Sequence, residues 1–117
     1  MTLTYVDNSA TISTSEYSLP AATTVGVPTS QTDDCILQVW LDLANLVAGD
    51  EFRARLYEKV TGAGATQRIV EEWSIVGAQA RPGRTFPTFM VGHGWDFTLL
   101  RVAGSDRVIG WSLRKVT

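Results

Sequence analysis

Hydrophobic and polar residues alternate along much of the chain, and the alternation is clearest in the segment CILQVWLDL, residues 35–43. Its odd-numbered positions are all apolar, whereas Gln38 and Asp42 occupy even-numbered positions. A period of two is typical of a strand with one buried face. Ile36 and Trp40 share the even-numbered face, so we expect that face to be partly covered as well. The residues expected to face the core are Cys35, Leu37, Val39, Leu41 and Leu43.

The segments EFRARLYEKV (51–60) and QRIVEEWSIV (67–76) predict a β-hairpin with the flexible sequence TGAGAT at its tip. Gly49 and Asp50 supply the turn before the first strand. Like faces of two paired strands must coincide, and a register with Val60 opposite Gln67 meets this condition. The cross-strand pairs expected from that register are Ala54 with Trp73, Phe52 with Ile75, and Arg55 with Glu72.

The C-terminal region predicts a short strand over 85–91 and then a second hairpin. Pro87 lies inside the short strand and indicates an edge or bulge position. The turn AGSD joins the last two strands, and we expect Val102 opposite Val108. This register stacks Leu99 on Trp111 and Phe97 on Leu113, and it brings Asp96 beside Arg114.

No segment shows sustained helical periodicity, and turn signals recur every 8 to 12 residues or so. We therefore expect an all-β protein, an antiparallel β-sandwich of Greek-key or jelly-roll-like type with six to eight strands. Residues 1–30 are rich in Ser and Thr and contain few apolar residues, which predicts a polar N-terminal arm with one or two short edge strands. Residues 31–117 form the single sandwich domain. Deletion of residues 1–20 is then expected to leave the sandwich folded.

Composition and charge narrow the classes of function. The chain has 117 residues, 44% of them hydrophobic, and a formal net charge of −2, so we expect neither nucleic acid nor membrane as a partner. The N-terminus lacks the basic and apolar regions of a secretory signal. The single Cys35 excludes an intramolecular disulfide and a cysteine metal cluster, and it fits folding in a reducing cytoplasm.

Candidate chemistry is sparse. His93, the only histidine, lies in GHGWD without a nucleophile motif, so we interpret it as a turn residue. Glu58 and Glu71 lie on the same face in the expected hairpin and could form the carboxylate pair of a glycosidase, but inward charge at an edge is the simpler interpretation. The pairs Asp33-Asp34 and Asp50-Glu51 lack the spacing of a calcium loop. We predict no catalytic residue, no metal site and no cofactor.

Surface residues offer better candidates, and they are for contact with a partner. Four tryptophans could form a platform for sugars, and a carbohydrate-binding module would require Trp40, Tyr57 and Tyr17 to align. Since three of the tryptophans fall on core faces, an exposed Trp40 is better evidence for a protein contact. The candidate partner contacts are Tyr5, Ile12, Tyr17, Trp40, Arg53, Arg55, Tyr57, Arg81 and Arg84.

Three segments, ATISTSEYSLPA, TDDCILQVWLDLANLVAGDEFRARLYEKV and GWDFTLLRVAGSDRVIGWSLRKV, give the chain a family resemblance. In pattern and composition it resembles small β-rich virion structural proteins of tailed bacteriophages, and it is most similar to capsid decoration (cement) proteins. The resemblance implies a non-enzymatic protein that is made in the host cytoplasm and binds the capsid surface in many copies. The implied partners are the major capsid protein and other copies of the same chain, with a trimer favoured. The N-terminal arm would attach by adding a strand. A small tail or head-completion protein, or a carbohydrate-binding β-sandwich module, remains an alternative.

Overall fold

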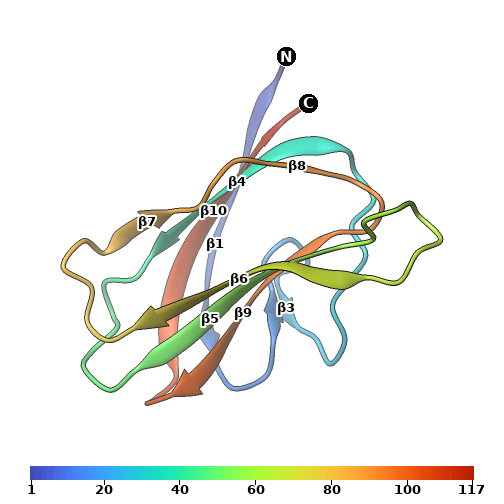
Figure 1. Cartoon of the computed structure of the whole chain (residues 1–117). Helices are drawn as coiled ribbons and strands as arrows, with labels where there is room; N and C mark the ends of the chain where they lie inside the picture. Colours follow the sequence, from blue (N-terminus) through green and yellow to red (C-terminus); the bar gives the residue numbers. More distant parts are fainter.

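The computed structural model describes residues 1–117 and contains two antiparallel sheets packed face to face (Figure 1). Sheet A has the order β1 (Leu3–Ile12), β10 (Arg107–Val116), β4 (Cys35–Asp42), and β4 then pairs with both β7 (Gly83–Thr85) and β8 (Phe89–Val91). Sheet B has the order β3 (Thr23–Thr24), β2 (Tyr17–Ser18), β9 (Asp96–Ala103), β5 (Glu51–Glu58), β6 (Arg68–Val76). The predicted antiparallel β-sandwich is confirmed. The ten strands exceed the expected six to eight because four of them contain only two or three residues and are too short to recognise from the sequence.

The chain crosses repeatedly between the two sheets. β1, β4, β7, β8 and β10 belong to sheet A, while β2, β3, β5, β6 and β9 belong to sheet B. With β7 and β8 taken as one interrupted strand, and the two-residue β3 set aside, the orders β1-β10-β4-β7 and β2-β9-β5-β6 are those of a jelly roll. No helix is present that is long and apolar enough to cross a membrane.

The core lies between the sheets and contains 20 buried apolar residues. The alternation in residues 35–43 is confirmed, because Leu37, Val39, Leu41 and Leu43 are at most 3% exposed. Two faces of aromatic and aliphatic side chains meet across the sandwich, and burial of this area is the main favourable contribution to folding. The largest fully buried side chains are Trp95, Phe52, Phe97, Ile12, Leu19 and Leu37.

The β5–β6 hairpin follows the predicted register along most of its length. Phe52 pairs with Ile75, Ala54 with Trp73, and Arg55 with Glu72. A bulge after Leu56 then shifts the register, and β5 ends at Glu58. The expected pair of Val60 and Gln67 is therefore absent, and Val60 is 61% exposed instead of facing the core.

The predicted C-terminal hairpin is wrong. β9 belongs to sheet B and β10 to sheet A, so residues 104–106 carry the chain from one sheet to the other. Phe97 and Leu113 do face a common core, but they meet across the sandwich and not as cross-strand neighbours. Apolar alternation identifies the inward residues of both strands correctly, yet it is the same for a hairpin and for two strands that face each other.

The N-terminal segment belongs to both sheets. β1 pairs with β10 over ten residue pairs, and β2 pairs with β9. Ile12 and Leu19 are fully buried. The boundary expected at residue 30 has no counterpart in this packing, and removal of residues 1–20 would take two core side chains with it. The packing therefore predicts a loss of stability on this truncation, in place of the intact fold expected from the sequence.

Pro87 interrupts the strand expected over residues 85–91. β7 ends at Thr85 and β8 begins at Phe89, and both pair with β4 at the edge of sheet A. Proline has no N–H to donate and is confined to edges and bulges of sheets. The edge position predicted from Pro87 is confirmed.

Candidate functional site

The outer face of sheet A carries a continuous row of apolar side chains. Leu3 pairs with Val116, Val116 with Ile36, and Ile36 with Met90, so the four side chains lie side by side across β1, β10, β4 and β8. Residues directly opposite in a sheet point to the same face. Because Leu37 and Val91 point into the core, their neighbours Ile36 and Met90 must point outward. We call these four residues the apolar row.

The apolar row leaves large side chains in water. Leu3 is 48% exposed, Ile36 is 42% exposed and Met90 is 86% exposed. The row lies at the end of sheet A where the two termini run side by side (Figure 1), since Thr2 and Thr117 exchange backbone hydrogen bonds. Contiguous exposed apolar side chains at one place mark a binding surface more often than scattered ones do.

Next to the apolar row, three side chains stack on one another. The Arg114 guanidinium lies 4.1 Å from the centre of the Trp40 ring and 5.4 Å from the centre of the Tyr5 ring. The Trp40 Nε1–H donates a hydrogen bond to Gln38 Oε1 at 3.0 Å, which fixes the indole in its plane. Arg114 Nε donates to Ser112 Oγ at 3.4 Å. We call Tyr5, Arg114 and Trp40 the stacked triad.

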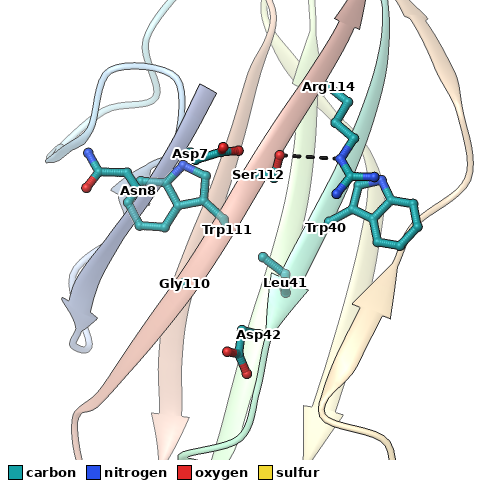
Figure 2. Close-up of a pocket in the computed structure, with 9 residues that line it drawn as sticks. All are labelled: Asp7, Asn8, Trp40, Leu41, Asp42, Gly110, Trp111, Ser112 and Arg114. Carbon is teal, nitrogen blue, oxygen red and sulfur yellow. Dashed lines mark hydrogen bonds between the residues drawn. The ribbon is translucent and has the colours of Figure 1, made fainter. Parts of the chain in front are cut away.

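A shallow groove of about 420 Å³ runs beside the stacked triad (Figure 2). The groove passes over Gly110, which has no side chain to fill it. The side chains nearest to that position are Asp42 and Ser9. Trp40 and Arg114 border one end in Figure 2, while Asp42 lies at the other. The residues lining the groove are Asp7, Asn8, Trp40, Leu41, Asp42, Gly110, Trp111, Ser112 and Arg114.

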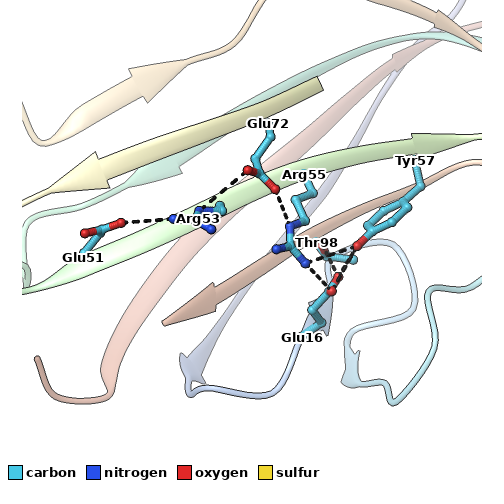
Figure 3. A network of polar contacts seen from close by, with 7 residues as sticks. All are labelled: Glu16, Glu51, Arg53, Arg55, Tyr57, Glu72 and Thr98. Atoms are coloured by element: carbon cyan, nitrogen blue, oxygen red, sulfur yellow. Dashed lines mark hydrogen bonds and ion pairs between the residues drawn. The ribbon is translucent and has the colours of Figure 1, made fainter. Parts of the chain in front are cut away.

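The outer face of sheet B has a different character, because its charged residues bind one another (Figure 3). Arg55 donates to Glu16 at 2.6 Å and to Glu72 at 2.7 Å. The Tyr57 hydroxyl and the Thr98 hydroxyl both lie within hydrogen-bond distance of the Glu16 carboxylate, at 2.9 and 2.8 Å. This network attaches the segment before β2 to β5 and β9, so we assign it a structural role.

The network also shifts the pKa values of two of its members, Tyr57 and Arg55. Burial raises the pKa of Tyr57, and its hydrogen bond with Glu16 acts in the same direction. Burial would lower the pKa of Arg55, but hydrogen bonds with Glu72 and Tyr57 outweigh burial and raise it. Both groups therefore keep their ordinary protonation state at neutral pH, tyrosine neutral and arginine charged, and neither is tuned for proton transfer.

The structure separates the nine predicted contact residues into three groups. Tyr5 and Trp40 lie on the outer face of sheet A, and Arg81 is exposed in the loop before β7. Arg53 and Arg55 are paired with glutamates, and Arg84 lies over the Phe86 ring at 5.0 Å. The residues whose side chains are mostly inside the protein are Ile12, which is fully buried, Tyr57, which is 8% exposed, and Tyr17, which packs edge-on against Trp111.

The residues weighed for catalysis do not assemble into a catalytic centre. The bulge in the β5–β6 hairpin pairs Glu58 with Arg68 and Glu71 with Leu56. The Glu58 carboxylate accepts a hydrogen bond from the Gly92 N–H at 2.8 Å, whereas Glu71 is exposed. His93 has a left-handed φ of 55° between two glycines, as suits a turn residue.

His93 also lines a second, smaller pocket of about 190 Å³ together with Ser30 and Asp34. No hydrogen bond joins these three side chains, and an activated nucleophile requires one. No group of three or more His, Cys, Asp or Glu side chains could hold a metal ion. Asp50 instead binds Arg107 at 2.8 Å, and Asp33 binds Lys115 at 3.0 Å.

Sequence reasoning missed three members of the apolar row and the role of Arg114. Ile36 was identified as lying on the second face of its strand, and Trp40 with it. Leu3, Val116 and Met90 come from three other strands, so only the pairing of those strands brings them beside Ile36. No local sequence signal marks such a row.

Comparison with known proteins reveals a similarity of fold and no related sequence. No protein-family model matches the sequence, and no curated protein matches it. Among solved structures, a protein of Bacillus endospore appendages, which form disulfide-linked pili, is similar to this chain with a TM-score of 0.56. The two sequences are 13% identical, and the similarity covers 98% of this chain and 87% of the other.

Proposed function

We propose that this chain is a non-enzymatic structural protein of a tailed-phage virion, a decoration protein that binds the assembled major capsid lattice. The apolar row and the stacked triad form the contact surface, and this surface is the observation that carries the proposal. Trp, Tyr and Arg are the residues that most often dominate binding energy in protein interfaces, and all three lie here beside exposed aliphatic side chains.

The geometry of the surface supports a flat protein partner. The apolar row crosses four adjacent strands of a sheet, so backbone pairing between these strands fixes the spacing of its side chains. Trp40 and Arg114 are fixed by contacts within the chain before any partner arrives. A preorganised surface loses little side-chain entropy on binding. A lattice that presents many copies of one site further strengthens attachment, because each added contact becomes intramolecular.

The likeness to a spore appendage protein supports a role as a subunit of an assembly in general terms. A pilus linked by disulfides along its length needs at least two cysteines in each subunit, and this chain has only Cys35. That residue is 8% exposed, and burial raises the pKa of its thiol, which lowers its reactivity in disulfide exchange. Disulfide links along the length of an assembly, as in those pili, are therefore not expected for this chain.

The proposal is tested by cosedimentation of the purified protein with phage heads. Expanded heads should bind the protein, and free capsid subunits should not. The double variant Ile36→Asp, Met90→Asp should lose binding by about tenfold or more, because it places two charges in the contact surface. Val60→Asp is the matched control, because Val60 is a 61% exposed valine in the loop after β5.

Binding to isolated tails in place of heads would move the protein to the tail and overturn the decoration role. If Val60→Asp weakens head binding as much as the double variant does, the apolar row is not the contact surface. Far-UV circular dichroism and the urea midpoint of each variant separate a lost contact from a lost fold.

A saccharide ligand is the second candidate, favoured by the groove beside Trp40. Carboxylate, amide and hydroxyl side chains from Asp7, Asn8, Asp42 and Ser112 surround it, and such groups recognise sugar hydroxyls. A carbohydrate-binding module would require Trp40, Tyr57 and Tyr17 to align, but the two tyrosines lie on sheet B strands and Trp40 on a sheet A strand. Quenching of tryptophan fluorescence by soluble glycans, lost in Trp40→Ala, would favour this candidate over the capsid role.

A further inference from the structure

Each sheet ends in one long strand whose outer edge is open. β1 contributes ten residues at the edge of sheet A, and β6 contributes nine at the edge of sheet B. The other edge strands, β3, β7 and β8, have two or three residues each. Trp73 of β6 packs against Phe86 and Phe89 beside β7 and β8, with ring centres 4.7 and 5.8 Å apart. The two open edges therefore lie on opposite sides of the sandwich.

The backbone of β1 points alternately toward β10 and toward solvent. Thr2 and Thr117 exchange both backbone hydrogen bonds, so the even-numbered residues of β1 bond to β10. Hence the N–H and C=O groups of the odd-numbered residues from Leu3 to Thr11 point away from the sheet. Within the chain, a side chain reaches one of these donors: Asn8 Oδ1 accepts from the Ser9 N–H at 2.8 Å.

The composition of β1 does not protect this edge. Natural edge strands usually carry Lys, Pro or a bulge that prevents another strand from adding. β1, LTYVDNSATI, has a regular register, no proline and a single charge at Asp7. Leu3, Tyr5 and Val6 are 40% to 57% exposed. An unprotected edge of this length is expected to be covered in the functional assembly.

The edge of β6 is open over residues 71–76, because a bulge at Val70 interrupts the register with β5 nearer the start of the strand. The Gly77 N–H donates to the Asp50 carbonyl at 2.8 Å, and the register then pairs Ile75 with Phe52 and Trp73 with Ala54. By the same alternation, the backbone groups of Ser74 and Val76 point away from β5. Within the chain, Gln79 Nε2 donates to the Val76 carbonyl at 3.1 Å. Ile69, Val70 and Val76 add apolar side chains that are 39% to 65% exposed.

We propose that β1 of one copy adds to β6 of the next copy, so that sheet A of one molecule continues into sheet B of its neighbour. The occupant of each edge is a second copy of this chain, because one molecule carries both edges: the ten-residue β1, and the regular part of β6 at residues 71–76. Pairing of two β1 strands is disfavoured. An antiparallel register that uses all the outward groups of β1 centres on Asp7 and sets two carboxylates directly opposite.

A contact between two different edges is head-to-tail. Each copy then has one edge of each kind, and the contact generates a ring if the rotation closes and a filament if it does not. The inference goes beyond the proposed function, since it concerns contacts between copies through the backbone edges of β1 and β6. Leu3 and Tyr5 of β1 also belong to the apolar row and the stacked triad, but the contact between copies uses the backbone groups of that strand.

Two proline variants test the contact, each removing one N–H that points away from its own sheet. Asp7→Pro blocks the edge of β1 without breaking its bonds to β10, and Ser74→Pro blocks the edge of β6 in the same way. Asp7→Ala and Ser74→Ala are the matched controls, since they change the side chain and keep the N–H. Sedimentation velocity over a range of concentrations measures the association of each protein, and far-UV circular dichroism verifies its fold.

The wild type and both alanine controls should form particles larger than a dimer at high concentration. Each proline variant alone should have an association about tenfold weaker or more. A mixture of the two should form a one-to-one heterodimer and nothing larger, because one intact β1 edge then meets one intact β6 edge.

Three results would overturn the inference. The wild type could remain a monomer at every concentration, Ser74→Pro alone could still dimerise through β1, or the mixture could fail to form the heterodimer. Head binding by the wild type is measured separately, so a failure here leaves the test of capsid attachment unaffected.

Discussion

Arg107 Nε donates a hydrogen bond to Asp50 Oδ2 at 2.8 Å and so joins the start of β10 to the turn before β5. The Asp50 carboxylate is 2% exposed and also accepts from the Val47 and Ser105 N–H groups, at 3.0 and 3.3 Å. The hydrogen bond from Arg107, followed by that from Val47, lowers the pKa of Asp50 to about 2. Gly104 passes so close to this carboxylate that a Cβ at that position would collide with it, and its φ of +86° also favours glycine.

The lowered pKa of Asp50 makes stability depend on pH in the acid range. Because its pKa in the unfolded chain is about 3.9, the contribution of Asp50 is fully present above about pH 4. It is lost as the pH falls through the folded value of about 2. Urea unfolding between pH 2 and pH 6 should therefore show a fall in the free energy of unfolding that Asp50→Asn reduces. Asp106→Asn is the control, because Asp106 pairs with Arg101 but has 46% of its side chain exposed.

Ile12 ends β1 with its side chain fully buried, so the N-terminal segment should contribute to stability. Ile12→Ala should lower the free energy of unfolding by about 2–5 kcal/mol, as is typical when a large buried side chain is truncated. Deletion of residues 1–12 should lower it further, since the backbone pairing of β1 with β10 is lost as well. Thr11→Ala, at an exposed position of the same strand, should change the value by less than about 0.5 kcal/mol. Equal effects of Ile12→Ala and Thr11→Ala in urea unfolding would contradict this assignment.

The inward faces of the long strands could be predicted from the sequence, and the partners of those strands could not. Alternation identified Leu37 and Val39 in β4, Phe97 in β9 and Leu113 in β10, because burial of one face imposes a period of two whatever strand lies alongside. The β5–β6 register was predictable as far as Leu56 because a short hairpin has few registers that keep its faces aligned.

The rest depends on contacts between distant parts of the chain. Residues 104–106 connect two sheets, although their sequence suits an ordinary hairpin turn equally well. The first 30 residues contain few apolar residues, a composition that predicts an arm. Their attachment instead uses polar groups, such as Glu16 with Arg55, and Ser18 with Asp96. The candidate surface combines residues of four strands, so its discovery required the strand order.

Asp96 and Ser18 form a buried polar contact that should stabilise the segment between β2 and β4. The Ser18 hydroxyl donates to Asp96 Oδ1 at 2.7 Å, and the Thr29 N–H donates to Asp96 Oδ2 at 2.8 Å. Ser18→Ala should lower the free energy of unfolding by about 1–3 kcal/mol, because it leaves a buried carboxylate short of one donor. Ser15→Ala is the control, because Ser15 is an exposed serine just before β2. Equal urea midpoints for the two variants would show that the contact contributes nothing.

The same carboxylate should give a pH dependence opposite in sign to that of Asp50. Burial raises the pKa of Asp96, although its hydrogen bonds act in the other direction. A raised folded pKa means that stability is highest below the unfolded value of about 3.9 and is lost as the pH rises through the folded value. In the Asp50→Asn background, the free energy of unfolding should therefore fall as the pH rises from about 4. A rise over that range would contradict the burial of an ionisable Asp96.

Arg114 should shield one face of Trp40, since its guanidinium lies 4.1 Å from the ring centre. Arg114→Ala should increase quenching of tryptophan fluorescence by acrylamide, and it should cost only about 0.5–1 kcal/mol of stability because the cation–π contact is partly open to solvent. Arg114→Lys should be intermediate, because lysine keeps the charge but lacks the planar group that covers the ring. Trp40→Phe provides the control: in that background Arg114→Ala should leave the quenching unchanged, because Trp95 and Trp111 are at most 4% exposed and Trp73 lies on sheet B. An increase that persists without Trp40 would show that Arg114 acts through the fold and not as a cover for the indole.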